Sequence, residues 1–409
     1  MKRRIDSWIK AISAVAAAAL AFGAQAAPGD GIRLGGAEAR LHPFIDLETR
    51  YDSNVNYSQS NQAIADLILH VRPGLELQAP SDVAAVEFSG ALDWAQYMGV
   101  NGDTSKLSNL YGTAGLAALF NRQGSVSPRL DNSFDRAPST TSLAAASVAV
   151  VSNRNTLALS VPYKPGGGAL VFAANAKWST ETFGEYLPLS SAQKAALADF
   201  AYDEYRVGGE VQWRFLPRTS GVLQADYLSR VPRASNRPDE ATGFDVIAGV
   251  TGLMTQRIAA TAKVGYGSTN ATNDSAANAS AFLTDLSAEW LPVDEVSVRA
   301  GYARSLGLDP TLSTYVSDTL SAGVRYKLAD RIAFKMGVRW DRFTFQAVDG
   351  ASSSYLRIDP QVEGLFGRWL KTSLGYVYST RSASWPAGLG GSPPDYSKNE
   401  VFLRVGLTY

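Results

Sequence analysis

Two histidines, His42 and His70, are the only imidazole bases in the sequence. A Ser–His pair of the kind that lipid hydrolases use is the chemistry that they would suggest. His42 directly precedes Pro43, and His70 stands near Arg72 on the polar side of its segment. No G-x-S-x-G or comparable nucleophile context accompanies either histidine. We therefore interpret both as ordinary polar positions, and we expect no catalytic residue and no enzyme activity.

Other chemical motifs are equally weak. The carboxylates Asp46 and Glu48 form a pair that is too common on the polar face of a strand to indicate a glycosidase. The Gly-rich stretch Pro165–Gly168 is typical of a turn, because no strand–loop–helix phosphate cradle follows it. The sequence contains no Cys, which excludes a thiolate nucleophile and a zinc–thiolate site, and two His leave little for a metal centre. We expect no cofactor and no metal.

The length and charge of the chain limit the kinds of structure that can position the remaining polar side chains. The chain has 409 residues, with 38 basic and 38 acidic side chains. This balance argues against nucleic acid as a partner, since nucleic-acid binding usually requires a basic face. The length permits two or three ordinary domains or one large closed β structure.

The N-terminus has the pattern of a secretory signal peptide. Residues 2–4 are Lys-Arg-Arg, 11–24 are mostly apolar, and Ala24-Gln25-Ala26 is an A-x-A cleavage pattern. We predict a signal peptide at 1–26, cleaved between Ala26 and Ala27, and a short periplasmic segment at 27–41. The apolar stretch is too short for a stable membrane span.

The rest of the chain alternates with a period of two residues. In 282–290, Phe282, Leu286 and Trp290 share one face, and Asp285 and Glu289 share the other. Such alternation favours strands over helices. The runs are about 9 to 13 residues long, close to the ~9–11 residues that a tilted strand needs to cross a bilayer.

Roughly eighteen such runs are present, and sixteen is also possible. The turns 79–82, 165–168, 216–219, 292–295 and 328–331 are short, whereas the loops 98–107, 183–203, 231–241, 268–279 and 381–397 are long. This alternation is typical of bacterial outer-membrane barrels, with the short turns on the periplasmic side. The predicted strand centres are residues 48, 71, 90, 114, 130, 155, 175, 210, 225, 249, 263, 286, 300, 321, 336, 360, 376 and 404.

Large apolar or aromatic residues recur where strands enter the short turns. Trp290, Tyr326, Phe366 and Tyr409 fit an aromatic girdle at the periplasmic interface. Their period near 40 would also suit a β-propeller, although the propeller signatures are missing. The last strand, 401–409, places apolar residues on one face and ends on an aromatic ring. It resembles the signal read by the barrel assembly machinery, carried by Val405, Leu407 and Tyr409.

Alternate residues along each strand point to opposite faces, so the side chains divide into a face toward lipid and a face toward the water-filled interior. Every backbone group must be paired inside a bilayer, so strands can span it only as a closed barrel. The expected outward set is Leu67, Leu69, Val71, Leu75, Leu77, Phe244, Val246, Ala248, Val250, Val296, Val298, Ala300 and Tyr302. The candidate lumen-lining set, of mixed charge, is Asp46, Glu48, Arg72, Glu87, Asp93, Arg129, Glu210, Arg214, Asp285, Arg299, Arg325, Arg339, Arg357, Glu363 and Arg404. The alternative is that these charges only pair across strands and fill the wall.

One long loop contains a helix pattern. Ser190 or Ser191 can cap a short helix that places Leu197 and Phe200 on its apolar side. The loop could fold inward as a constriction or lie on the rim, and the sequence does not decide between the two.

Residues 44–55, Phe-Ile-Asp-Leu-Glu-Thr-Arg-Tyr-Asp-Ser-Asn-Val, resemble the opening strand and first outer loop of outer-membrane β-barrel porins encoded with exopolysaccharide clusters. Val71-Arg72-Pro73-Gly74-Leu75 and Trp290-Leu291-Pro292-Val293 are also similar to that family. The resemblance in architecture covers about 42–409. It implies an outer-membrane conduit for secreted polysaccharide and brings no catalytic or ligand positions with it.

We therefore expect an all-β protein: one transmembrane antiparallel barrel over 42–409, in the outer membrane of a Gram-negative bacterium, passing exopolysaccharide or capsular polysaccharide outward. A general diffusion porin and a structural or adhesive surface barrel are the alternatives. The expected partners are outer-membrane lipid, the assembly machinery, a polysaccharide-export lipoprotein and the polysaccharide itself, with no nucleic acid.

Overall fold

The computed structural model describes residues 29–35, 38–139, 149–234, 240–272, 278–309, 314–346, 350–386 and 395–409. The predicted signal peptide and its cleavage site, Ala26 and Ala27, lie outside these residues.

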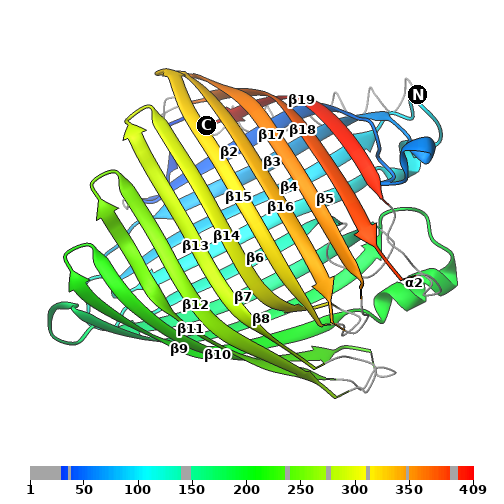
Figure 1. Ribbon diagram of the computed structural model, residues 1–409. Helices are drawn as coiled ribbons and strands as arrows, with labels where there is room; N and C mark the ends of the chain where they lie inside the picture. The colour runs from blue at the N-terminus through cyan, green and yellow to red at the C-terminus, as the bar shows by residue number, and fades with distance from the viewer. Residues whose placement is uncertain are drawn as a thin grey trace.

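The chain folds into a closed antiparallel barrel of eighteen strands, β2 to β19, each paired with its neighbours in sequence (Figure 1). The last strand pairs with the first, from Glu400↔Asp52 to Thr408↔Phe44, which closes the wall and leaves no free edge. The strands are β2 (Arg40–Asp52), β3 (Asp66–Ala79), β4 (Ala84–Tyr97), β5 (Asn109–Phe120), β6 (Arg129–Ser139), β7 (Val150–Tyr163), β8 (Leu170–Glu185), β9 (Tyr202–Leu216), β10 (Thr219–Pro232), β11 (Ala241–Thr255), β12 (Ile258–Ala271), β13 (Ala279–Val293), β14 (Val296–Leu308), β15 (Thr314–Ala329), β16 (Ile332–Phe345), β17 (Ser352–Phe366), β18 (Leu370–Ser384) and β19 (Tyr396–Thr408).

Among the residues that the structure describes, the helical segments are the 3-10 turns η1 (Ser60–Gln62), η2 (Thr104–Leu107) and η3 (Pro165–Gly167), and the helix α2 (Ser191–Ala198). In the described part of the chain, no helix is long and apolar enough to cross a membrane.

Every predicted strand centre falls inside a strand, but the strands are longer than the expected 9 to 13 residues. They contain 11 to 16 residues, and residues 268–271 and 381–384, predicted as loop, belong to β12 and β18. About 9–11 residues suffice to cross a bilayer at a tilt. The ladders therefore continue past the membrane on the side of the long loops.

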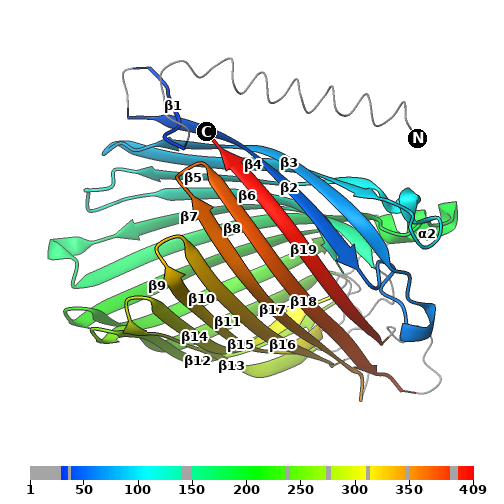
Figure 2. The same cartoon turned by 90° about the horizontal axis from the view of Figure 1, so that it is seen from above.

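Connections differ at the two ends of the barrel. Two-residue turns at 217–218, 256–257, 294–295 and 330–331 lie at one end, which we call the short-turn end. The connection 186–201 lies at the other, the long-loop end. The first barrel strand, β2, begins at the short-turn end, and the last strand, β19, ends there (Figure 2), as an even number of strands requires.

The two faces of the wall follow the predicted parity. Leu75, Phe244 and Val246 of the outward set are about 40% to 46% exposed. Trp290 and Tyr326 are also exposed, close to the short turns. Charged side chains on the outward face, such as Arg304 and Arg342, stand near the long-loop ends of their strands. The apolar band is thus kept clear of charge where the cost of burying an arginine is greatest.

A short strand completes the seam between the first and last strands. β1 (Ile32–Arg33) pairs with residues 40–41 of β2, beyond the point where β19 ends. Asp30 forms an ion pair with Arg368 at 2.7 Å, and the Arg40 guanidinium donates to the Asp30 carbonyl at 2.7 Å. These contacts fix the N-terminal segment to the short-turn end.

Candidate functional site in the barrel lumen

The candidate site is the inward face of the barrel. The strand register places all of the predicted lumen-lining residues on the face opposite the apolar one. It brings most of them together in three groups. Asp46, Glu48, Arg72, Asp93 and Arg404 lie on β19–β2–β3–β4, and Glu87 and Arg129 lie on β4 and β6. Asp285, Arg299, Arg325, Arg339, Arg357 and Glu363 lie on β13 to β17, whereas Glu210 and Arg214 stand apart on β9.

The first group centres on a carboxylate with no exposed side-chain surface. Glu48 forms ion pairs with Arg50 at 2.7 Å, with Arg72 at 2.9 Å and with Arg404 at 2.5 Å. Removing a carboxylate from water is costly unless charged hydrogen bonds replace the lost solvent. Three guanidinium groups from β2, β3 and β19 supply these bonds, so Glu48 ties the closing strands together.

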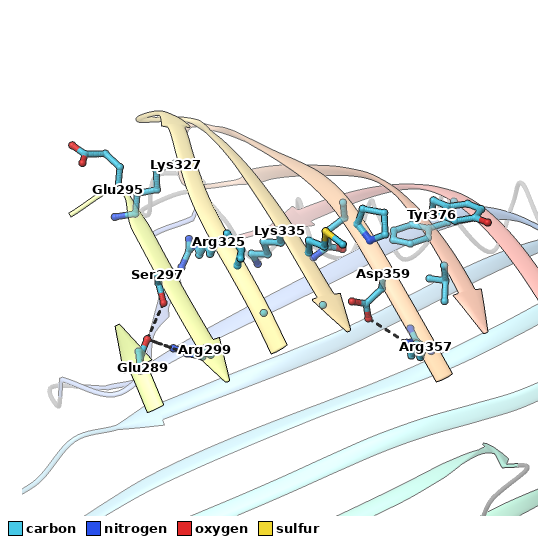
Figure 3. Close-up of a pocket in the computed structure, with 18 of the residues that line it drawn as sticks. Glu289, Glu295, Ser297, Arg299, Arg325, Lys327, Lys335, Arg357, Asp359 and Tyr376 are labelled. Carbon is cyan, nitrogen blue, oxygen red and sulfur yellow. Dashed lines mark hydrogen bonds and ion pairs between the residues drawn. The ribbon is translucent and has the colours of Figure 1, made fainter. Parts of the chain in front are cut away.

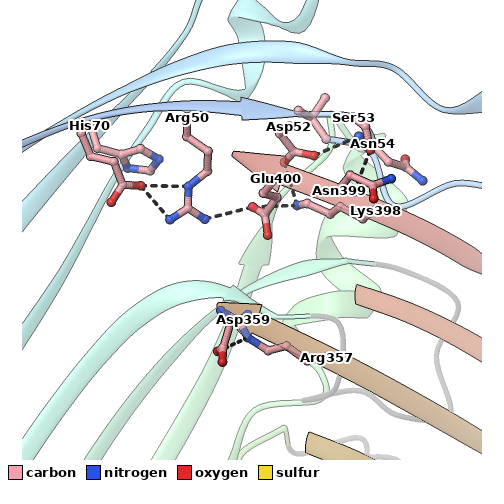
Figure 4. A network of polar contacts seen from close by, with 12 residues as sticks. Arg50, Asp52, Ser53, Asn54, His70, Arg357, Asp359, Lys398, Asn399 and Glu400 are labelled. Atoms are coloured by element: carbon pink, nitrogen blue, oxygen red, sulfur yellow. Dashed lines mark hydrogen bonds and ion pairs between the residues drawn. The ribbon is translucent and has the colours of Figure 1, made fainter. Parts of the chain in front are cut away.

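The network continues in both directions along the seam, and Figure 4 shows the part that includes Arg50, Lys398 and Glu400. Toward β4, Asp93 binds Arg72 at 2.9 Å and the Nδ1 atom of His70 at 2.8 Å. Toward the long-loop end, Arg50 pairs with Glu400 at 2.9 Å, and Lys398 pairs with Asp52 at 2.7 Å. We call these residues the seam network. It comprises Glu48, Arg50, Asp52, His70, Arg72, Asp93, Lys398, Glu400 and Arg404.

Neither histidine has the surroundings of a catalytic base. His70 is nearly buried in the seam network, on the inward face and away from lipid. The ring of His42 lies against Gly31 of the N-terminal segment, where a Cβ atom would come within 2.4 Å of it. Within the described ranges, no Ser or Thr hydroxyl is hydrogen-bonded to either ring. The arrangement offers structural roles for both residues.

In the group on β13 to β17, Arg299, Arg325 and Arg357 line a cavity of about 660 Å³ on the inward face of β13 to β19 (Figure 3). Seven basic and four acidic side chains line this cavity. We call five of the inward cations of β14 to β17 the cationic wall. They are Arg299, Arg325, Lys335, Arg339 and Arg357.

Like charges face each other across neighbouring strands of the cationic wall. Arg325 is directly opposite Lys335, and Arg339 is directly opposite Arg357. Lys335 turns to Glu363 at 2.7 Å, and Arg339 and Arg357 turn to carboxylates two residues along their own strands. In the part of the chain that the structure describes, Arg325 has no ion pair. Such opposed cations destabilise a sheet unless an anion compensates them.

The wall about halfway round the barrel carries the opposite charge. A cavity of about 370 Å³ on β3 to β7 is lined by Glu76, Glu87 and Asp131 and by no basic side chain. Its other lining residues are small or uncharged, such as Ser89 and Thr156. Arg129, at the adjacent strand start, pairs with Asp131 at 2.7 Å. We call Glu76, Glu87 and Asp131 the acidic wall.

An aromatic cluster occupies the long-loop end and was not predicted from the sequence. The Tyr57 ring lies edge-on to Tyr186 at 5.8 Å and to Tyr396 at 5.4 Å, and the Lys398 amine lies 4.1 Å from its centre. The Tyr186 hydroxyl donates to the Val55 carbonyl at 2.8 Å. Burial raises the pKa of the Tyr57 and Tyr186 hydroxyls above their ordinary value. These contacts join loop 53–65 to loop 186–201 at the long-loop end of the barrel.

The sequence signal for this cluster was the Tyr-Asp-Ser-Asn-Val stretch at 51–55. Asp52 pairs with Lys398 and accepts the Asn54 amide at 2.9 Å. The Asn54 side chain donates to the carbonyls of Ser58 and Ser397, and Val55 is fully buried. The motif therefore builds the turn that directs the first outer loop inward, next to β19.

Helix α2 forms where the sequence predicted it. Ser190 caps the helix in a reciprocal arrangement with Gln193. Leu197 is buried against Phe183 and Tyr202 at the ends of β8 and β9. The helix thus packs on the rim, and Tyr186 of the same loop joins the aromatic cluster.

A second polar cluster links strands near α2 and was not predicted from the sequence. Glu181, which is buried, binds Arg154 and accepts the Tyr202 hydroxyl at 2.6 Å. Arg230 pairs with Glu204 at 2.5 Å and donates to the Leu308 carbonyl at 2.5 Å. The last bond joins β10 to the end of β14, four strands away. The long-loop end is therefore narrowed by side chains as well as by loops.

No curated protein matches the chain. Among solved structures, OpdK of Pseudomonas aeruginosa is 10% identical over 90% of this chain and 99% of its own, with a TM-score of 0.46. OccAB3 of Acinetobacter baumannii (10%, 91% and 99%, TM-score 0.45) and the FrpB iron transporter of Neisseria meningitidis (9%, 90% and 81%, TM-score 0.45) are similar to the same extent. Scores this low say nothing about cargo.

The barrel wall is closed, apolar outside and polar inside, as an outer-membrane porin requires. A family comparison agrees with this architecture. The family model described as "Putative beta-barrel porin 2" matches residues 29–408, and the chain belongs to that family.

Proposed function

We propose that this porin is a conduit that exports exopolysaccharide or capsular polysaccharide across the outer membrane of a Gram-negative bacterium. In this proposal the short-turn end faces the periplasm and the long-loop end faces the exterior. The observation that carries it is the inward face, which is polar and of both charges on strands all round the barrel. An eighteen-stranded barrel is wide enough to hold water and a hydrophilic chain.

The contact between two loops at the long-loop end supports a dedicated conduit over a general diffusion porin. A diffusion porin must stay open at rest, whereas here loops 53–65 and 186–201 meet through Tyr57, Tyr186 and Val55. An adhesive barrel would need its loops but would not need a polar lumen with cavities. These features favour transport of a cargo that displaces the loops.

The proposal assigns partners to each surface. Lipid covers the outward face, and the assembly machinery reads the last strand at Val405, Leu407 and Tyr409. A polysaccharide-export lipoprotein would deliver cargo at the short-turn end, where β1 and Asp30 shape the rim. Nucleic acid has no role.

Deletion of the gene, followed by quantification of surface polysaccharide, tests the proposal. We expect export to be lost and to return when the wild-type chain is supplied, but not when an assembly-defective Val298→Arg chain is supplied. Unchanged surface polysaccharide in the deletion strain would reject the conduit. Planar-bilayer recordings of the purified barrel separate the alternatives, because a diffusion porin would conduct steadily without cargo.

A further inference from the structure

We propose that the cationic wall is a binding site for a polyanionic glycan, a chain of sugars that bear carboxylates. This inference rests on the proposed function and narrows its cargo. The predicted lining residues are of mixed charge, but basic side chains outnumber acidic ones in the cavity on β13 to β19, and all the charged side chains that line the cavity on β3 to β7 are acidic. Figure 3 shows Arg299, Arg325 and Lys335 projecting from neighbouring strands along the same cavity.

The first argument is the uncompensated charge of the wall. Arg325 faces Lys335 across the ladder, and its other cross-strand neighbour is Ser297, which carries no charge. Lys335 is satisfied by Glu363, which leaves Arg325 as a cation without a carboxylate among the described residues. A sheet gains nothing from this arrangement by itself. A ligand carboxylate beside Arg325 would form a bidentate ion pair and remove the repulsion.

The second argument is the repetition of the charge. Neighbouring strands lie ~4.8 Å apart, so cations on adjacent strands form closely spaced pairs of positive charge, although protein carboxylates already bind Lys335, Arg339 and Arg357. Arg325 and Lys335 form one pair, and Arg339 and Arg357 form another four residues along the strands. Repeated positive charge matches a polymer of repeated negative charge better than a single small anion.

The third argument is the floor between the two pairs. Gly323 and Gly337 are paired with each other midway between the cation pairs, and both line the cavity. A Cβ atom at Gly323 would meet nothing closer than 3.6 Å, so this glycine leaves space beside Arg325, whereas the Asp359 carboxylate that pairs with Arg357 lies over Gly337. Arg299 is the direct neighbour of Gly323 on β14 and adds a cation at the edge of the strip.

The fourth argument is the acidic wall. Glu76, Glu87 and Asp131 lie near the same short-turn end, roughly halfway round the barrel from Arg325. A polyanion entering the lumen would be repelled from this wall and attracted to the cationic one. The two walls therefore direct an acidic chain to one side of the lumen by electrostatic attraction and repulsion, whereas a neutral chain would experience neither.

Isothermal titration calorimetry of the folded, detergent-solubilised barrel tests the site. The probes are a hexamer of galacturonic acid and the neutral maltohexaose. We expect the uronic hexamer to bind, with an affinity that falls as salt rises, and maltohexaose to give no heat. The Arg325→Gln/Lys335→Gln variant should bind the uronic hexamer at least tenfold more weakly.

The matched control is Lys177→Gln/Lys263→Gln, which removes the same charge from inward positions outside this cavity and should bind as the wild type does. The site is rejected if the uronic hexamer gives no heat, if maltohexaose binds equally, or if both double variants lose affinity alike. Loss of export on gene deletion without uronate binding would leave the conduit standing and remove the site. Binding with unchanged export would keep the site and remove the conduit.

Discussion

The seam network and the cationic wall use the same residue types in opposite ways. In the seam, Glu48 is completely covered and holds three guanidinium groups, and Lys398 is only 5% exposed. On the cationic wall, the Arg299 side chain is 72% exposed, and Arg325 has no carboxylate partner in the described structure. The seam is therefore balanced internally, whereas the wall leaves charge available to the lumen.

The cause of this difference is the identity of the cross-strand neighbour. Glu48 faces Arg404 on β19, and Asp46 faces Arg72 on β3, so opposite charges meet where the barrel closes. Arg325 faces Lys335, so like charges meet. The residue opposite an inward arginine on the neighbouring strand therefore decides whether that arginine links strands or stays available to a ligand. The residue type alone does not distinguish the two roles.

The largest expected effect is on the seam. Glu48→Ala leaves Arg50, Arg72 and Arg404 without their shared carboxylate, which should lower the free energy of unfolding by about 3–5 kcal/mol. Thermal unfolding of the purified barrel, followed by circular dichroism, measures the change. Glu289→Gln, which breaks the exposed pair with Arg299, is the control and should change little. Equal losses in both variants would erase the distinction between seam and wall.

The next effect tests the two faces of one strand. Val298 shares an outward row with Trp290 and Val324, so Val298→Arg places a charge against lipid at a cost of roughly 2–4 kcal/mol at mid-depth. Arg299→Val removes an inward cation and should be far milder. The yield of folded barrel in the outer membrane is the measurement. A larger defect from Arg299→Val would reverse the assignment of the faces.

The sequence determined the strands because one physical rule governs all of them. A lipid face and a wet face impose a period of two, so Phe282 and Asp285 reveal a strand and its orientation without any partner. The closing pair, β19 with β2, followed from the need to leave no edge. Lengths were underestimated because ladders continue beyond the bilayer, where polar side chains obscure the alternation.

Contacts between distant segments could not be predicted in the same way. Tyr57 and Tyr186 meet although 129 positions separate them in the printed sequence, and loop residues carry no periodicity. The register also decided the partners of each inward charge, since a shift of one residue would turn Arg325 toward lipid. Candidate lining residues were therefore identified as a set, but their sorting into seam, cationic wall and acidic wall required the fold.

A smaller effect concerns the aromatic cluster over the lumen. Tyr57→Ala removes two ring contacts and the ring beneath Lys398, together worth about 1–2 kcal/mol. We expect this loss to release loop 53–65 and to raise single-channel conductance in planar bilayers. Tyr57→Phe keeps the ring and should conduct like the wild type. Identical conductance in all three chains would show that the loops do not restrict the mouth.

The smallest effect isolates the opposed cations of the wall. Arg325→Gln removes a repulsion with Lys335 and breaks no ion pair, so stability should stay the same or rise slightly, unlike the loss expected at Glu48. A double-mutant cycle with Lys335→Gln, measured by chemical denaturation, should give a repulsive coupling of about 0.2–1 kcal/mol between the two positions. High salt should reduce this coupling, because the side chains face water. A favourable coupling would mean that the two groups share an anion within the protein, and Arg325 would then belong with the seam rather than with the ligand.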